Sequence, residues 1–251
     1  MKFFNDTSSK IITRFVNVLF TIGIFLICGF IAVIVPSTST SFYEHQFNKN
    51  NTLNKVQRQS YYLSGDAKEY VANMSMDELL SLMDHTMDYC LYFEDDLNIT
   101  VDGTHLEVFR QDEYVHMQDV KVLFGGGYVL LTVGLLFFVG GLVYNLKFKT
   151  QYFKYARRTA YYTLGVILVI LLVIALFALI DFDMAFTVFH QILFPGKQWT
   201  FASGVMVAMI ADIFTGLAPI ILAVWVVLLG IFTGVIYYIN KRKFNQKIDK
   251  N

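Results

Sequence analysis

The chain has 251 residues and a formal net charge of zero; 55% of the residues are hydrophobic and only 16% are charged. A soluble domain of this length does not need such a low charged fraction, and the charge balance gives no sign of nucleic-acid binding. The apolar residues are gathered into long runs, and the first run, 15–36, follows a short N-terminal segment, 1–14. Since about 20 apolar residues cross the hydrocarbon core of a bilayer, we expect the first membrane helix there.

The first apolar run also resembles a secretory signal peptide in its position. Its length of about 21 residues exceeds the roughly 7–15 residues of a typical signal-peptide core, which favours a retained membrane helix. Small residues follow the run (Ser37, Thr38 and Ser39), so cleavage remains the alternative interpretation.

Residues 37–121 are predicted to form a small α+β domain inserted between the first and second membrane helices. Ser75 and Glu78 have the spacing of a capping box, in which each side chain satisfies a free amide at a helix start. We therefore expect a helix from Met76 to about Tyr92. Asp102-Gly103 lies between two β-rich runs, which is typical of a type I′ hairpin.

Three more apolar runs are long enough to cross a membrane. They cover 122–146, 160–181 and 217–240. The predicted fold class is therefore membrane α-helical, with four transmembrane helices. A basic loop, 147–159, follows the second helix, and a basic tail, 241–251, ends the chain. The segment 182–216 is aromatic and amphipathic, so we expect a loop and helix in the membrane interface.

The distribution of Lys and Arg predicts the orientation. These residues dominate the N-terminal segment, the 147–159 loop and the tail, whereas Asp and Glu outnumber them in residues 37–121. Basic flanking segments stay on the cytoplasmic side of a membrane. We therefore expect a multi-pass protein of the cell membrane, with both termini in the cytoplasm and the inserted domain outside.

The cysteines predict neither a disulfide nor a metal site. Cys28 lies in the first apolar run and Cys90 in the inserted domain, so the two thiols are not expected to meet. There is no Cys-x-x-Cys pair, no zinc-ligand spacing and no Gly-rich phosphate loop. The sequence therefore predicts that the protein uses no metal and no cofactor.

A polar stretch leads directly into the second membrane helix. Helical spacing places Glu113, His116 and Asp119 on one face, at steps of three. A carboxylate one turn away can hold an imidazole in one tautomer and stabilise its protonated form, as a general base requires. The alternative is that these are polar residues on a solvated helix turn.

A second histidine is expected at the same membrane depth. His190 belongs to the interfacial segment after the third helix, which also contains Trp199. Trp199 is interpreted as an interfacial anchor, and His190 as either an interfacial hydrogen-bonding residue or half of a site. If His116 and His190 converge beside a carboxylate, they form a candidate site for acid–base chemistry on a lipid-linked substrate.

At these residues the chain resembles a known family. The stretches that carry the likeness are Met74–Leu80, Glu113–Lys121, Phe189-His190 and Phe194–Trp199. Together with the four-helix layout, they resemble the bacterial membrane family that includes the lipoprotein intramolecular transacylase, over nearly the whole chain. After Trp199 the family has a stretch containing a proline; here residues 203–214 have none, and Asp212 is the acidic residue. This departure leaves open a member with another substrate.

The resemblance implies an enzyme that moves an acyl chain from the glyceryl moiety to the α-amino group of a lipoprotein's N-terminal diacylglyceryl-cysteine, giving the lyso-form. Its partners are then lipid-modified N-termini of lipoproteins and membrane lipid, with no nucleic acid. The resemblance implies His116 and His190 as the catalytic pair and Asp119 and Glu113 as orienting carboxylates. Trp199, Lys121 and Met117 are the candidate substrate-binding residues, and Lys121, Lys197 or backbone amides could stabilise the oxyanion.

The residues present suit this chemistry. An ammonium cannot attack an ester, so a base must first remove a proton, and histidine has a suitable pKa of about 6.5. The sequence has no Gly-x-Ser-x-Gly elbow for a covalent nucleophile and no His-x4-Asp acyltransferase signature. The alternative function is a non-enzymatic membrane sensor or assembly protein whose outer domain binds a ligand or protein. A transporter is disfavoured because the spans hold almost no charged residues.

Overall fold

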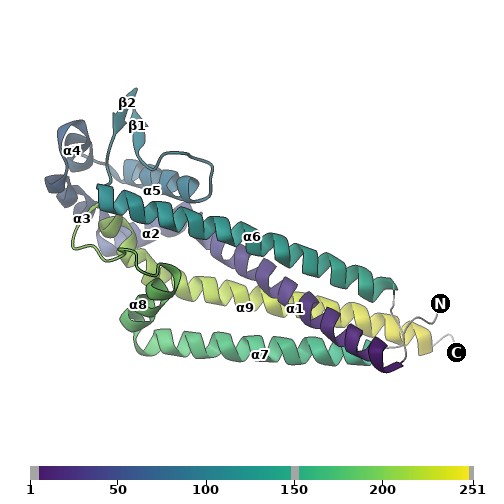
Figure 1. Ribbon diagram of the computed structural model, residues 1–251. Helices are drawn as coiled ribbons and strands as arrows, with labels where there is room; N and C mark the ends of the chain where they lie inside the picture. Colours follow the sequence, from purple (N-terminus) through teal and green to yellow (C-terminus); the bar gives the residue numbers. More distant parts are fainter. Residues whose placement is uncertain (1–5, 148–152, 249–251) are drawn as a thin grey trace. The chain divides into compact units, whose positions relative to one another are not determined.

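The computed structural model describes residues 6–147 and 153–248. Figure 1 shows the elements, which are predominantly helical. The long helices are α1 (Asp6–Ser37), α6 (Gln111–Lys147), α7 (Phe153–Ile180) and α9 (Val205–Ile248). The short elements are α2 (Thr40–Asn50), α3 (Thr52–Gln59), η1 (Ser60–Tyr62), α4 (Gly65–Ala72), α5 (Met76–Cys90), β1 (Ile99–Val101), β2 (Thr104–Leu106) and α8 (Phe182–Leu193).

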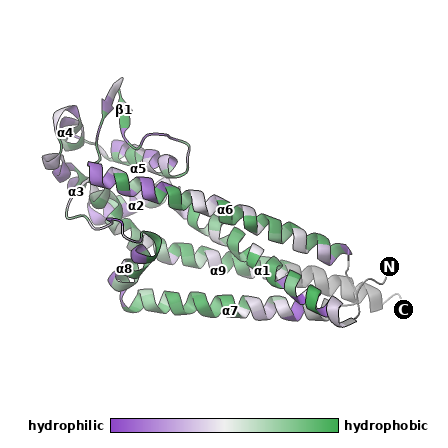
Figure 2. Ribbon diagram, in the orientation of Figure 1, coloured by the Kyte–Doolittle hydropathy of each residue, from purple (hydrophilic) through white to green (hydrophobic). Residues whose placement is uncertain are grey.

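Four helices are long and apolar enough to cross a membrane. Their candidate spans are Thr7–Ser37, Gln111–Lys147, Ala156–Ile180 and Gly216–Val235. The colouring of Figure 2 shows long hydrophobic stretches on these helices, whereas α3 and α4 are mainly hydrophilic. The predicted fold class is confirmed: a membrane α-helical protein with four spans and a small two-stranded sheet.

The described residues fall into two compact units. One unit comprises the described residues of 1–33, 128–176 and 222–251, and the other comprises 34–127 and 177–221. In the first unit, α1 and α6 pack closely, because a Cβ added at Gly23 would lie 2.7 Å from the Gly134 carbonyl oxygen. Glycine at such a crossing lets two membrane helices approach each other closely.

The second unit contains the inserted domain. Its core gathers apolar side chains from α2 to α6, the hairpin and the start of α9. The capping box is confirmed: the Ser75 hydroxyl accepts from the Glu78 amide, and the Glu78 carboxylate accepts from the Ser75 amide. The type I′ hairpin is confirmed too, since Asp102 and Gly103 both have positive φ, 49° and 81°, between paired strands.

Two parts of the chain contain more helix than the sequence predicts. The polar segment after α1 forms α2, α3 and α4, where the sequence predicts no helix before Met76. These short helices bury Tyr43, Phe47 and Val56 in the core, so tertiary packing stabilises them although their sequence is polar. The fourth long helix begins at Val205 rather than at 217, and α8 accounts for the interfacial helix. The side chain of Asp212 lies outside the described residues.

The side of the membrane on which each segment lies stays a prediction, and it can be tested. In a background with Cys28 and Cys90 changed to alanine, a cysteine at Asp102 should react with a membrane-impermeant thiol reagent in intact cells. A cysteine at Arg157 should react only after the cells are permeabilised, since basic loops stay inside. The opposite labelling pattern would reverse the orientation.

Candidate active site

The structure brings the two predicted histidines together. His116, in the second turn of α6, and His190, near the end of α8, have ring centroids 6.3 Å apart with an angle of 27° between the rings. Both are buried, with 7% and 5% of their surface exposed. The prediction that the imidazoles meet is therefore confirmed, while their catalytic role stays a prediction.

One hydrogen bond determines the tautomer of His190. Its Nδ1 lies 2.8 Å from the carbonyl oxygen of Phe186, one turn earlier in α8. A carbonyl can only accept, so Nδ1 carries the proton and Nε2 of the neutral ring keeps a free lone pair. Burial lowers the pKa of His190 below its usual value. At neutral pH the ring is therefore uncharged and able to take up a proton.

His116 differs from His190, because its buried Nδ1 has no hydrogen-bond partner among the residues that the structure describes. Buried polar atoms in native proteins are nearly always paired, so an orphan in a candidate site indicates a place for a substrate group or water. The sequence predicted that Asp119 or Glu113 would bond to this ring. Among the described residues, neither carboxylate forms a hydrogen bond with the His116 ring, so this prediction of the hydrogen-bond partner is wrong.

Glu113 is instead bonded to backbone amides. Its side chain is fully buried; Oε1 accepts from the Met206 amide at 2.9 Å and the Val207 amide at 3.4 Å, and Oε2 accepts from the Arg110 amide at 3.1 Å. Two of these amides belong to the first turn of α9, where no intrahelical acceptor exists. Glu113 therefore caps α9 from another helix.

The backbone beside Glu113 has no space for a side chain. Gly204 has a φ of 134°, and a Cβ placed there would overlap the Glu113 carboxylate. The Gly204 amide donates to Gln59 Oε1 at 2.9 Å. Ser203, which precedes Gly204, is bonded to Arg110. The Arg110 guanidinium donates to the carbonyl oxygen and the hydroxyl of Ser203 at 3.0 and 2.8 Å. These bonds connect the segment before α9 to the end of α3 and to the residue that precedes α6.

Aromatic side chains surround the two imidazoles. The Trp199 ring centroid lies 4.9 Å from that of His190, and Phe201 lies 5.5 Å from His116. Phe194 contacts both histidines, at 5.2 and 5.6 Å. Trp199 therefore packs against the candidate site, in addition to any anchoring role. Such apolar walls keep water away from a reacting ester.

Two predicted substrate-binding residues have other contacts. The Lys121 ammonium donates to the carbonyl oxygen of Glu94 at 2.8 Å and lies over the rings of Tyr89 and Tyr92. Met117 is 4% exposed and packs in the core of its unit. The structure therefore does not support Lys121 as a group that stabilises the oxyanion, or Met117 as a substrate contact.

Asp119 forms an ion pair with Lys197, with 3.0 Å between Oδ1 and Nζ. Asp119→Asn should therefore lower the acyl transfer that the resemblance implies less than about ten-fold, because a partly exposed ion pair contributes only about 0–1 kcal/mol. Lys197→Gln should have the same small effect, measured as conversion of a reporter lipoprotein. An Asp119→Asn loss as large as that of a histidine variant would show that Asp119 acts on His116 directly.

The sequence did not single out the Phe186 carbonyl, Phe201, Arg110 or Gly204. Of these, only the Phe186 carbonyl could have been predicted from nearby sequence, since a histidine in a helix can donate to the carbonyl oxygen four residues earlier. The other three act through contacts between distant segments.

Comparisons with known proteins agree with this fold. The family model described as "Lipoprotein intramolecular transacylase Lit" matches residues 16–214. The structure of the membrane integral lipoprotein intramolecular transacylase Lit from Bacillus cereus is similar with a TM-score of 0.70 and 18% sequence identity, covering 94% of this chain and 98% of that chain.

Two structures of variants of the B. cereus protein, with a histidine changed to arginine or to alanine, are also similar. Their TM-scores are 0.67 and 0.65 at 18% and 17% identity, and each covers 94% of this chain and 95% of that chain. No curated protein matches the chain by sequence. At such identities the structural likeness shows the fold.

Proposed function

Since the chain belongs to the lipoprotein intramolecular transacylase family, we propose that it transfers an acyl chain from the glyceryl moiety to the α-amino group of a lipoprotein's N-terminal diacylglyceryl-cysteine. The observation that carries the proposal is the buried histidine pair. The Nδ1 proton of His190 leaves the lone pair of the neutral ring on Nε2, and the ring centroid of His116 lies 6.3 Å away, with an Nδ1 that has no hydrogen-bond partner among the described residues.

In the proposed reaction the α-ammonium group first releases one proton to solvent. The neutral amine nitrogen then attacks the ester carbonyl carbon while Nε2 of His190 takes a second proton from it. The tetrahedral intermediate collapses with cleavage of the bond between that carbon and the glyceryl oxygen. The leaving oxygen takes up the proton, so a secondary amide and a free glyceryl hydroxyl result. The spacing of carboxylates around His116 pointed to that residue as the base, but the tautomer of His190 favours His190.

His116 is proposed to bind the reacting centre. Its unpartnered Nδ1 suits a hydrogen bond to the leaving oxygen or to the amine, whichever lies on its side of the pair. Since amine and ester belong to one molecule, holding them in contact can contribute up to about 7–11 kcal/mol in ideal geometry. A covalent nucleophile is then unnecessary.

The position of the pair matches the proposed substrate. His116 comes shortly before the apolar part of α6, and α8 follows the third span. We propose that this level is the outer membrane surface, as the distribution of Lys and Arg predicts. The acyl chains of the substrate then stay in lipid while its amine reaches the histidines.

The test is mass spectrometry of one reporter lipoprotein in a bacterial host that lacks this activity. Expression of the protein should shift the reporter's N-terminus from a free α-amine to an N-acylated lyso-form of the same mass, which fragmentation distinguishes. If an authentic transacylase converts the reporter and this protein does not, the sensor or assembly alternative replaces the proposal.

A further inference from the structure

The loop between α5 and β1 carries two adjacent aromatic side chains on its surface. Tyr92 is exposed, and 73% of the Phe93 surface is exposed. Exposed apolar residues are common on proteins, so exposure alone identifies no partner. Figure 1 shows this loop beside α6, and the contacts between the two determine the depth at which the aromatic side chains lie.

A defined turn at the end of α5 presents these side chains. The Phe93 amide donates to the carbonyl oxygen of Asp88 at 2.9 Å, and the Tyr92 amide donates to that of Tyr89 at 3.2 Å. This is the Schellman pattern, in which glycine usually takes the left-handed position and the next apolar side chain packs back on the helix. Here Tyr92 takes that position, with a φ of 67°, and Phe93 is exposed instead. A bulky residue in this conformation is rare, and such outliers indicate a role for the side chain.

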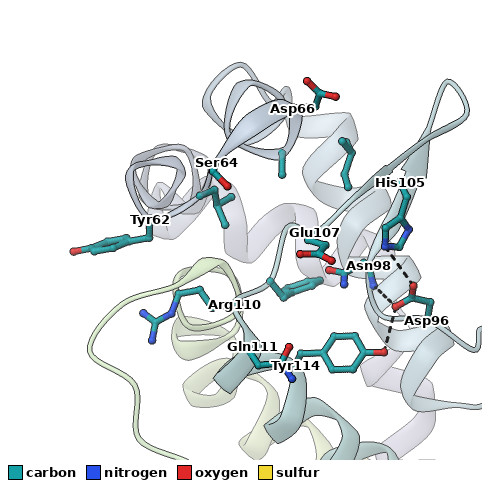
Figure 3. A pocket seen from close by; sticks show the side chains of 14 residues that line it. Tyr62, Ser64, Asp66, Asp96, Asn98, His105, Glu107, Arg110, Gln111 and Tyr114 are labelled. Atoms are coloured by element: carbon teal, nitrogen blue, oxygen red, sulfur yellow. Dashed lines mark hydrogen bonds and ion pairs between the residues drawn. The ribbon is translucent and has the colours of Figure 1, made fainter.

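The loop follows α6 toward the apolar part of that helix. Near the start of α6, the Tyr114 hydroxyl donates to Asp96 Oδ1 at 3.3 Å, as Figure 3 shows. Two residues earlier in the loop, the carbonyl oxygen of Glu94 accepts from Lys121 Nζ at 2.8 Å. Lys121 lies about 10 Å further along α6 than Tyr114. The loop is therefore fixed to the helix at two levels.

Tyr92 continues this course to Gly125. A Cβ added at Gly125 would lie 2.6 Å from the Tyr92 hydroxyl oxygen, so the tyrosine fills the space beside that glycine. About 20 residues cross the hydrocarbon core, and counted back from Lys147 they end about three residues from Gly125. Gly125 therefore lies at the boundary between hydrocarbon and headgroups. Phe93 is held at this level, because the residues on either side of it contact α6 there.

The charges near Phe93 limit how deep the loop can lie. Glu94 and Asp95 follow it and are exposed, and carboxylates stay out of hydrocarbon. The Lys121 ammonium lies over the Tyr92 ring, 5.0 Å from its centroid. Aromatic rings with charged groups beside them suit the membrane interface, where one end of a side chain is apolar and the other is wet.

We propose that Tyr92 and Phe93 insert into the bilayer interface on the side of the inserted domain and hold that domain against the lipid. The neighbouring surface of α6 continues the same contact, since Val122 is 68% exposed at the start of the predicted span. The inserted domain then has a lipid contact of its own, in addition to the helices that connect it to the membrane. This inference goes beyond the proposed function and does not depend on it.

Spin labels measure the depth directly. In a background with Cys28 and Cys90 changed to alanine, the variant Phe93→Cys is labelled with a nitroxide and reconstituted in phosphatidylcholine vesicles. Electron paramagnetic resonance then gives the collision rates of the label with oxygen, which concentrates in lipid, and with a water-soluble nickel chelate. Phe93 is exposed, so its replacement should not disturb folding.

Tyr62→Cys is the matched control, with the same label in the same unit. Tyr62 is an exposed aromatic residue that borders a polar hollow beside Gln111, about 21 Å along α6 from Gly125. Val122→Cys supplies the value for lipid contact. The ratio of the oxygen rate to the nickel rate should be several-fold higher at residue 93 than at residue 62, and closer to the ratio at residue 122.

Two results would overturn the proposal. A ratio at residue 93 equal to that at residue 62 would place the loop in water. Low rates with both oxygen and the nickel chelate at residue 93 would show that protein covers it, as in contact with a second copy of the chain. No lipoprotein is present in the vesicles, so either result leaves the proposed transacylase function untouched.

Discussion

His190→Ala should abolish formation of the N-acylated reporter while the protein still accumulates in the membrane. Loss of a general base removes about 10²–10⁴ of the rate, and the bond from Nδ1 of His190 to the Phe186 carbonyl oxygen leaves the lone pair of the neutral ring on Nε2. His116→Ala should reduce conversion comparably, because its buried Nδ1, which has no hydrogen-bond partner among the described residues, is proposed to bind the reacting centre.

The measurement is the initial rate of reporter conversion by mass spectrometry, normalised to the membrane level of each variant. His45→Ala is the matched control, because His45 is an exposed histidine of α2 in the same unit and should leave the rate unchanged. A Trp199→Phe variant should be the mildest change, since an apolar ring still covers His190. Full conversion by the His190→Ala protein would end the assignment of a histidine base.

Glu113→Ala should destabilise the protein more than any other single carboxylate change in this unit. It leaves the amides of Arg110, Met206 and Val207 without their acceptor in a buried place. At about 1–3 kcal/mol for each of the three lost partners, the expected loss is roughly 3–9 kcal/mol. That corresponds to a fall in thermal midpoint of roughly 6–36 °C for a chain of this size.

Thermal unfolding in detergent measures this effect, with Glu44→Ala as the control because Glu44 is exposed on α2. Gly204→Ala should be similarly harmful, since the new Cβ overlaps the Glu113 carboxylate. The double variant Glu113→Ala/Gly204→Ala should be less harmful than the sum of the two, because the Cβ enters the vacated space. Additive losses, or an unchanged midpoint for Glu113→Ala, would contradict the capping role.

The membrane helices and the local motifs can be predicted from the amino-acid sequence without the tertiary structure. Length and hydropathy alone identify α1, α6, α7 and α9, because a bilayer requires about 20 apolar residues whatever the neighbours are. The Ser75–Glu78 capping box and the Asp102-Gly103 turn form between residues at most three apart, so nearby residues suffice to predict them. The helices α2 to α4 were missed because their stability comes from burying a few side chains in a distant core.

The sequence predicts part of the arrangement of the two histidines. Positions relative to the spans place His116 and His190 at one membrane depth, and the structure brings their rings together. The partners of Glu113 were decided by the tertiary structure alone. A carboxylate three residues before a histidine has the same local spacing whether it bonds to that ring or to an amide 93 residues away. Only the folded chain brings the unpaired amides of α9 to Glu113, and a buried carboxylate binds where several donors converge.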